Sequence, residues 1–90
     1  MAASERGAKR QPEGARTLAD VRRHETVRIV NVDLPPDTAA WLAAVGLECG
    51  EEVTLLRRAI LGGPLHIRLE RGGELAVARD VAARVMVEGT

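Results

Sequence analysis

"PLHIRLERGGELAVA", residues 64–78, is the stretch of sequence that decides the fold. Leu65, Ile67 and Leu69 alternate with polar residues, which is the period of a strand with one face in a core and the other in water. The pair Gly72-Gly73 follows, and glycines adopt the positive φ of a tight hairpin turn without a steric penalty. A second run of strand-forming residues, "ELAVA", completes the pattern. The stretch therefore predicts an antiparallel β-hairpin.

Further strands are predicted on both sides of this hairpin. "TVRIVNV", residues 26–32, is rich in β-branched residues, and "EEVTLLRRA", residues 51–59, places Val53 and Leu55 on one face. "RVMVE", residues 84–88, is the last strand, and it follows one helical turn in "RDVAAR". Five short strands with tight turns predict a mainly β protein, a small, strongly bent antiparallel barrel whose closure hides the sheet edges.

One short α-helix is predicted between the first two strands. Asp37 is a suitable N-cap, and Trp41, Leu42 and Val45 recur at the spacing of one helical face. Gly46 stands where a residue in the left-handed conformation ends a helix. The two prolines just before Asp37 end the preceding strand, because proline cannot donate to a β-ladder. The helix therefore follows the first strand directly.

The chain of 90 residues is long enough for one domain. Residues 1–16 combine glycine, alanine, proline and charge without an apolar period, and we expect a disordered, weakly basic leader there. The folded domain is expected at residues 17–90. It begins at Thr17, where Thr17 and Asp20 resemble a capping box that predicts a helical turn over residues 18–22.

Composition excludes several classes of function. The formal net charge is zero, which argues against a nucleic-acid-binding protein that neutralises phosphates. The single cysteine, Cys49, allows no internal disulfide and fits a reducing compartment. No apolar run approaches the roughly 20 residues that span a bilayer, and the N-terminus lacks the apolar stretch of a secretory signal. We expect a cytoplasmic protein that meets a membrane only through a partner.

The order and spacing of several motifs resemble one known family. "TLADV", "VRIVNV", a helix ending in "VGL", and "GEEVTLLRRAILGGPLHIRLERGGELAVARDVAARVMVE" occur in the order found in the FeoA family of bacterial ferrous iron uptake, over residues 17–88. The resemblance implies an SH3-like barrel, which is also the C-terminal domain of some metal-dependent repressors. It implies a non-enzymatic regulatory module that acts on the cytosolic part of a membrane iron transporter, without catalytic residues or a cofactor.

The residues themselves indicate no catalytic or metal site. Cys49 lies among acidic residues, which raise a thiol pKa and so disfavour the reactive thiolate. His24 and His66 are the histidines of the chain, and no pair of candidate ligands has the spacing of a metal motif. We therefore interpret both histidines as surface residues. An SH3-style groove for proline-rich peptides is not expected either, because Trp41 is the sole aromatic residue.

An apolar docking surface is the remaining hypothesis. In "RRAILGGPLHIRL", residues 57–69, the Gly-Gly-Pro turn is preceded by Ile60 and Leu61, although turns normally face water. We predict a cleft between this turn and the helix. Its expected partner-binding residues are Trp41, Leu42, Ile60, Leu61 and Leu65. Two alternatives stay open: a homodimer formed through the same surface, and a metal-sensing domain that binds a transition metal ion.

Overall fold

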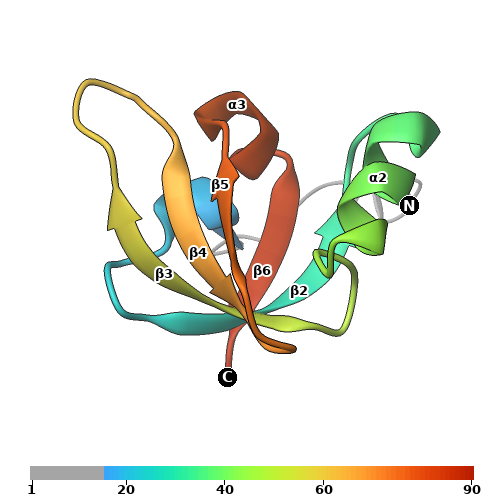
Figure 1. The fold of residues 1–90 in the computed structure, drawn as a ribbon, viewed down its shortest axis with the longest axis horizontal. Coiled ribbons are helices and arrows are strands. Elements are labelled where there is room, and N and C mark those ends of the chain that lie inside the picture. The colour runs from blue at the N-terminus through green and yellow to red at the C-terminus, as the bar shows by residue number, and fades with distance from the viewer. Residues whose placement is uncertain (1–15) are drawn as a thin grey trace, which may run out of the picture.

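One curved antiparallel sheet is the main element of residues 16–90, which are the residues that the computed structural model describes (Figure 1). Three short helical segments connect its strands. In chain order the elements are β1 (Arg16–Thr17), the 3-10 helix η1 (Leu18–Asp20), β2 (Thr26–Val32), α2 (Pro36–Ala44), β3 (Glu52–Arg58), β4 (Leu65–Leu69), β5 (Glu74–Val77), α3 (Arg79–Ala82) and β6 (Val85–Gly89). The predicted leader lies outside the described residues except for Arg16, which belongs to β1 rather than to the leader.

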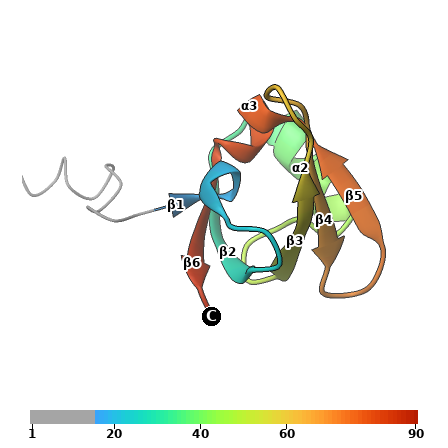
Figure 2. The same cartoon turned by 90° about the vertical axis from the view of Figure 1, so that its left-hand side faces the viewer.

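The strands follow the order β1-β6-β2-β3-β4-β5, and every pairing is antiparallel. The mainly β architecture is confirmed. The sheet is strongly curved and has one concave and one convex face (Figure 2). The predicted closure of the barrel is wrong for the described residues, because β1 and β5 are edge strands and no ladder joins them. Bulges between Ile29 and Asn31 and between Leu55 and Arg57 bend the strands, which gives the curl without a closed ring.

The sheet has six strands rather than five, because β1 pairs with the far end of the chain. Arg16 lies opposite Val87 and Thr17 lies opposite Met86. A strand of two residues shows no alternation, so no local pattern predicts it. Its place in the sheet depends on a partner strand that is about seventy positions away.

The core is made of aliphatic side chains on the concave face of the sheet. The alternation in β4 is confirmed, since Leu65, Ile67 and Leu69 are buried while Arg68 is exposed. Val27 and Ile29 of β2 face the same core. The other buried apolar residues are Leu18, Val21, Leu42, Leu47, Val53, Leu55, Val77, Ala82, Val85, Met86 and Val87. Burying a side chain of this size contributes about 1.5–3 kcal/mol, so this cluster is the main stabilising feature of the small domain.

Helix α2 begins one residue before its predicted N-cap. Pro35 is the N-cap and Pro36 is the first helical residue, so the predicted role of Asp37 as the cap is wrong. Proline suits that position because its fixed φ matches the helix and the missing N–H would have no intrahelical partner. The carboxylate of Asp37 instead lies in the first turn, where it interacts favourably with the positive end of the helix dipole.

The C-terminal end of α2 has the glycine cap that the sequence predicts. Gly46 has φ of 107°, its N–H donates to Ala43 O at 3.0 Å, and the N–H of Leu47 donates to Leu42 O at 2.9 Å. This pair of hydrogen bonds is a Schellman motif. It turns the chain so that Leu47 enters the core with Leu42. The cap thereby fixes which face of α2 packs against the sheet.

Candidate interaction site

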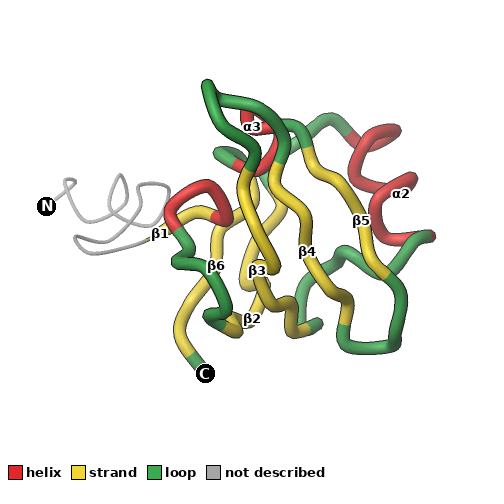
Figure 3. The backbone as a smooth tube through the Cα atoms, turned by 60° about the vertical axis from the view of Figure 1, so that its left-hand side comes forward, coloured by secondary structure: helices red, strands yellow, loops and turns green. Residues whose placement is uncertain are grey.

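The turn between β3 and β4 presents two large apolar side chains to solvent. Ile60 is 83% exposed and Leu61 is 97% exposed. The turn extends from one end of the sheet, beside α3 (Figure 3). A single exposed apolar side chain is ordinary, but two consecutive apolar side chains at the tip of a turn form a compact apolar surface. The exposure expected for these two residues is confirmed.

The backbone of this turn places Leu61 in an unfavourable conformation. Leu61 has φ of 59° and Gly62 has φ of 76°, and the N–H of Gly63 donates to Ile60 O at 3.2 Å. Positive φ at both central residues is typical of a type I′ turn, in which glycine, asparagine and aspartate are favoured. The left-handed conformation costs a residue with a branched side chain about 1–2 kcal/mol. A leucine that is both strained and exposed contributes little to the fold, which makes its side chain a candidate for partner binding.

Gly63 has a separate, steric reason for lacking a side chain. A Cβ atom at this position would lie 2.7 Å from the Cβ of Ala59, on the opposite side of the turn. The N–H of Ala59 donates to Pro64 O at 3.0 Å and closes the base of the turn. The two arms therefore lie too close together for a second side chain. This close approach explains why position 63 is a glycine.

A second apolar surface lies on the outer face of α2. Trp41 is 61% exposed and Val45 is 38% exposed, and residues four positions apart are neighbours on a helix surface. Ala40 and Ala44 are also exposed, so the outward face of the helix carries no charge beyond Asp37. Tryptophan is enriched among residues that anchor protein interfaces. Trp41 therefore remains a candidate for partner binding.

Two of the five predicted partner-binding residues belong to the core. Leu42 is 4% exposed and Leu65 is 0% exposed, and both lie in the buried cluster. Leu42 lies on the side of α2 that packs against the core, about 100° around the helix from Trp41, and Leu65 lies on the inward face of β4. Neither side chain can contact a partner in the folded protein. This corrects the sequence-based prediction for both residues.

The prediction of a cleft between α2 and the turn is also wrong, because α3 lies between them (Figure 1). The groove beside the turn is instead bordered by residues 62–64 on one side and by α3 on the other. Its lining also includes Ala76, Ala78, Arg79, Asp80 and Ala83, and its volume is about 780 Å³. The exposed tip of the turn therefore adjoins a mostly apolar groove that contains one guanidinium and one carboxylate.

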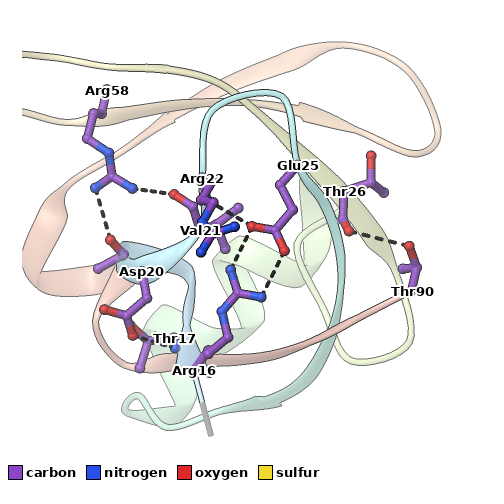
Figure 4. A network of polar contacts seen from close by, with 10 residues as sticks. Arg16, Thr17, Asp20, Val21, Arg22, Glu25, Thr26, Arg58 and Thr90 are labelled. Carbon is purple, nitrogen blue, oxygen red and sulfur yellow. Dashed lines mark hydrogen bonds and ion pairs between the residues drawn. The ribbon is translucent and has the colours of Figure 1, made fainter. Parts of the chain in front are cut away.

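Polar contacts tie the segment before β2 to the sheet (Figure 4). Arg16 and Glu25 form a two-pronged ion pair, and the backbone N–H of Arg22 donates to Glu25 Oε1 at 2.9 Å. The hydrogen bonds from Arg16 and then from Arg22 lower the pKa of Glu25 to about 2 from its ordinary value of 4.5. Arg58 of β3 donates to Ala19 O at 2.9 Å and to Val21 O. These contacts are structural, and none of their residues lines the groove.

The structure separates the residues that could have bound a metal ion. His24 lies in the bend before β2 with φ of 71°, His66 lies on the outer face of β4, and Cys49 is exposed after α2. Within residues 16–90, no three His, Cys, Asp or Glu side chains are grouped so that they could hold a metal ion. In the same range, no helix has the length and apolar character needed to cross a bilayer.

The comparisons with known proteins agree on the fold. The FeoA protein from Chlorobium tepidum is 25% identical, with a TM-score of 0.75 over 80% of this chain and 68% of that chain. An iron uptake regulatory protein (FeoA) is 24% identical, with a TM-score of 0.71 over 82% of this chain and 94% of that chain. A manganese-dependent transcriptional repressor, in complex with manganese, is 19% identical with a TM-score of 0.76, over 84% of this chain but only 37% of that chain.

The sequence itself supports the same assignment. No curated protein matches it. The family model of the FeoA domain, however, matches residues 16–89, which span nearly all of the described structure. Its first matched residue is the first residue of β1, and its last is the end of β6. The match thus includes every strand of the SH3-like sheet, and the chain belongs to the FeoA domain family.

Proposed function

We propose that this chain is a non-enzymatic accessory protein of ferrous iron uptake, acting in the cytosol on the membrane iron transporter of the same system. Membership of the FeoA domain family supports the connection with iron uptake. The similarity to an iron uptake regulatory protein (FeoA) supports a regulatory rather than a catalytic role. The chemistry that the described residues offer is an apolar surface, which suits docking.

The observation that carries the proposal is the conformation of Leu61. The side chain is 97% exposed and its φ is 59°, so the fold would be at least as stable with asparagine or glycine there. Burying a leucine against a partner contributes about 1.5–3 kcal/mol, which is enough to offset the cost of the strained backbone. We propose that Leu61 and Ile60 insert into an apolar depression on the cytosolic part of the transporter, and that Trp41 contacts it separately.

The test is a binding measurement between the full chain and the isolated cytosolic part of the transporter from the same organism. The Leu61→Asn variant keeps the left-handed turn and removes the apolar side chain, so any loss of affinity reports the contact alone. We expect the dissociation constant to rise about 10-fold or more, in the range of an interface anchor. Trp41→Ala is expected to weaken binding as well, because tryptophan is a common interface anchor and Trp41 is exposed and outside the buried core.

Val30→Thr is the matched control, since Val30 is also an exposed apolar residue, at 45%, but lies on β2 and not in the turn. It should bind as the original chain does. Equal binding by the Leu61→Asn variant and the original chain would exclude the turn as the docking site. Sedimentation of the full chain alone separates docking from the homodimer alternative, in which the Leu61→Asn variant would become monomeric. Calorimetry with Fe(II), Mn(II) and Zn(II), with His24→Ala and His66→Ala as controls, tests the metal-sensing alternative.

A further inference from the structure

An exposed cluster of basic side chains lies beside the end of β3. None of its members belongs to an ion pair within residues 16–90. We call this cluster the basic rim, and it consists of Arg22, Arg23, His24, Arg57 and Arg58. The first three belong to the bend between η1 and β2, and the other two are the last residues of β3. Arginine keeps its charge at every physiological pH, so the basic rim carries permanent positive charge.

Hydrogen bonds join the two parts of the basic rim. The N–H of His24 donates to Leu55 O at 2.6 Å, so the bend lies beside the middle of β3. The guanidinium of Arg58 donates to Val21 O, the carbonyl that directly precedes Arg22 (Figure 4). The basic side chains of the bend and of β3 therefore belong to one surface.

The carboxylates of the neighbouring segments do not cancel the charge of the basic rim. Glu25 forms an ion pair with Arg16, and this pair adds one charge of each sign. Helix α3, which packs on η1, also adds one charge of each sign, through Arg79 and Asp80. Asp20 of η1 is the remaining carboxylate of these segments. The four arginines of the rim less this one carboxylate leave a net charge of +3, with histidine neutral.

The opposite end of β3 is acidic. Glu52 is the first residue of β3, and its N–H donates to Glu70 Oε1 at 3.0 Å. Arg71 forms ion pairs with both Glu48 and Glu51. The formal net charge of the whole chain is zero, so the positive side of the domain results from the separation of its charges. A domain with this separation meets an anionic surface in one preferred orientation.

The exposed apolar side chains of the turn adjoin the basic rim. Strand β3 leads from the rim into the turn, so Ile60 and Leu61 follow Arg58 by two and three positions (Figure 1). The two apolar side chains are 83% and 97% exposed. Basic side chains beside apolar ones suit a membrane surface, because the cations attract anionic headgroups and the apolar side chains enter the boundary between headgroups and acyl chains.

We propose that the basic rim, together with Ile60 and Leu61, binds an anionic lipid bilayer directly. The arginines contact phosphate oxygens of the headgroups, and the two apolar side chains enter the bilayer boundary. This differs from the expectation that the protein meets a membrane only through a partner. The inference goes beyond the proposed function: the bilayer collects the domain on the surface in which the transporter lies, and the turn leaves the lipid when it docks on the transporter.

A nucleic acid is a less suitable occupant of the same surface. Its phosphates would also attract the arginines, but single strands are held by bases that stack on aromatic side chains. Trp41 is the sole aromatic residue, and it lies on α2 and not beside the basic rim. The exposed leucine and isoleucine would stay in water on a phosphate backbone, whereas a bilayer buries them.

The first test is co-sedimentation of the full chain with lipid vesicles. One set of vesicles is pure phosphatidylcholine, and the other contains about one third phosphatidylglycerol, which is anionic. We expect binding to the anionic vesicles, several-fold weaker binding at high salt because salt screens the charges, and little binding to the neutral vesicles. No binding to the anionic vesicles, or equal binding to both sets, would overturn the proposal.

Two substitutions of exposed arginines form a matched pair for the same assay. Arg57→Gln removes a charge from the basic rim and should weaken vesicle binding about fivefold. Arg71→Gln removes a charge from the acidic end and should leave binding unchanged, because charge effects fade over about 8 Å at physiological salt. Equal weakening by both would mean that net charge alone matters, and it would overturn the site.

A double substitution in the bend enlarges the expected effect. Arg22→Gln together with Arg23→Gln should weaken vesicle binding about 10-fold or more. The backbone N–H of Arg22, which donates to Glu25, is kept in this variant. Arg58 is left unchanged because its guanidinium holds the bend. Thermal unfolding of each variant shows that it folds, and binding by the folded double variant at the original affinity would exclude the rim.

Tryptophan fluorescence reports which side of the domain meets the lipid. Trp41 lies on α2, which α3 separates from the turn (Figure 1), so its emission should not shift when anionic vesicles are added to the original chain. A variant with Ile60→Trp and Trp41→Phe carries its single tryptophan in the turn, and its emission should shift to shorter wavelength. A shift of Trp41 in the original chain without a shift in this variant would place α2 on the lipid and overturn the proposal.

The outcomes distinguish this inference from the proposed function. The vesicle experiments do not involve the transporter, so their failure overturns the lipid site and leaves docking on the transporter intact. If the original chain does not bind the transporter, the proposed function fails, and the vesicles still decide the inference. If Arg57→Gln weakens binding to the isolated cytosolic part of the transporter but the original chain does not bind vesicles, the rim contacts protein and the lipid site is excluded.

Discussion

The guanidinium of Arg16 donates to both carboxylate oxygens of Glu25, at 2.8 Å from Nη1 and 2.6 Å from Nη2. Arg16 belongs to the edge strand β1, and Glu25 lies just before β2. The ion pair thus clamps the first described residue of the chain across the bend that contains η1. Both side chains are partly exposed, at 32% and 28%, so salt screens the pair and its role is mainly to position β1 against β6.

This pair predicts a specific dependence of stability on pH. The pKa of Glu25 in the folded protein is about 2, below its ordinary value of 4.5, so the folded state favours the charged carboxylate. Its contribution to stability is complete above the ordinary value and is lost as the pH falls towards the folded pKa. We expect the Glu25→Gln variant to show a smaller loss of stability between pH 4.5 and 2 than the original chain. Urea unfolding across this range measures it, and equal pH slopes would contradict the assignment.

The close approach of Gly63 and Ala59 predicts a pair of compensating substitutions. Gly63→Ala introduces a Cβ atom 2.7 Å from Ala59 Cβ and should lower the free energy of unfolding by about 1–3 kcal/mol. Adding Ala59→Gly removes the clashing atom and should restore most of that loss. Chemical denaturation of the two single variants and the double variant forms a double-mutant cycle. If the two effects simply add, then the arms of the turn do not touch as described.

Leu65 and Leu61 lie four positions apart, but replacing each with alanine is predicted to change the stability of the domain by very different amounts. Leu65 is fully buried, so Leu65→Ala should lower the free energy of unfolding by about 2–5 kcal/mol. Leu61 is almost fully exposed, and Leu61→Ala should change it by no more than about 0.5 kcal/mol. Thermal unfolding of both variants tests the assignment of one residue to the core and the other to the surface. Similar destabilisation by both would show that the turn packs against the domain.

The left-handed conformation of Leu61 predicts that glycine at this position stabilises the domain. Leu61→Gly removes the steric cost of positive φ and should raise the free energy of unfolding by up to about 1 kcal/mol, after the greater entropy of glycine in the unfolded chain is included. Leu65→Gly, in an extended strand, should do the reverse. Urea unfolding of both variants measures the difference. A lower stability of Leu61→Gly would mean that the leucine side chain supports the fold.

Much of the fold follows from local patterns. The alternation at Leu65, Ile67 and Leu69 predicts which face of β4 is buried, because side chains in a strand point to opposite sides in turn. The cap at Gly46 is predictable for a similar reason, since only a residue without a Cβ atom adopts positive φ at low cost. The exposure of Ile60 and Leu61 follows from the Gly-Gly-Pro turn that they precede. Each of these features depends on residues within a few positions of one another.

The residues of the candidate site were harder to predict from local patterns. Trp41 and Leu42 are adjacent on α2, yet one is exposed and the other buried, because the packing direction of the helix is decided by the Schellman turn and the core behind it. The burial of Arg79 Nε was not predicted from the sequence. An arginine at the start of a short helix is ordinary in a sequence, and the signal that distinguishes it, a buried Nε under Gly62, exists only in three dimensions.

The amino-acid sequence alone determined the strand-rich architecture, the inward and outward faces of the hairpin at residues 64–78, and the apolar turn, because these depend on alternation and on the backbone freedom of glycine. The tertiary structure alone decided that β1 pairs with β6, that the sheet stays open, and that α3 rather than α2 borders the groove beside the turn. These relationships join residues far apart in the chain. They are set by how the aliphatic core packs as a whole, and no local pattern encodes that.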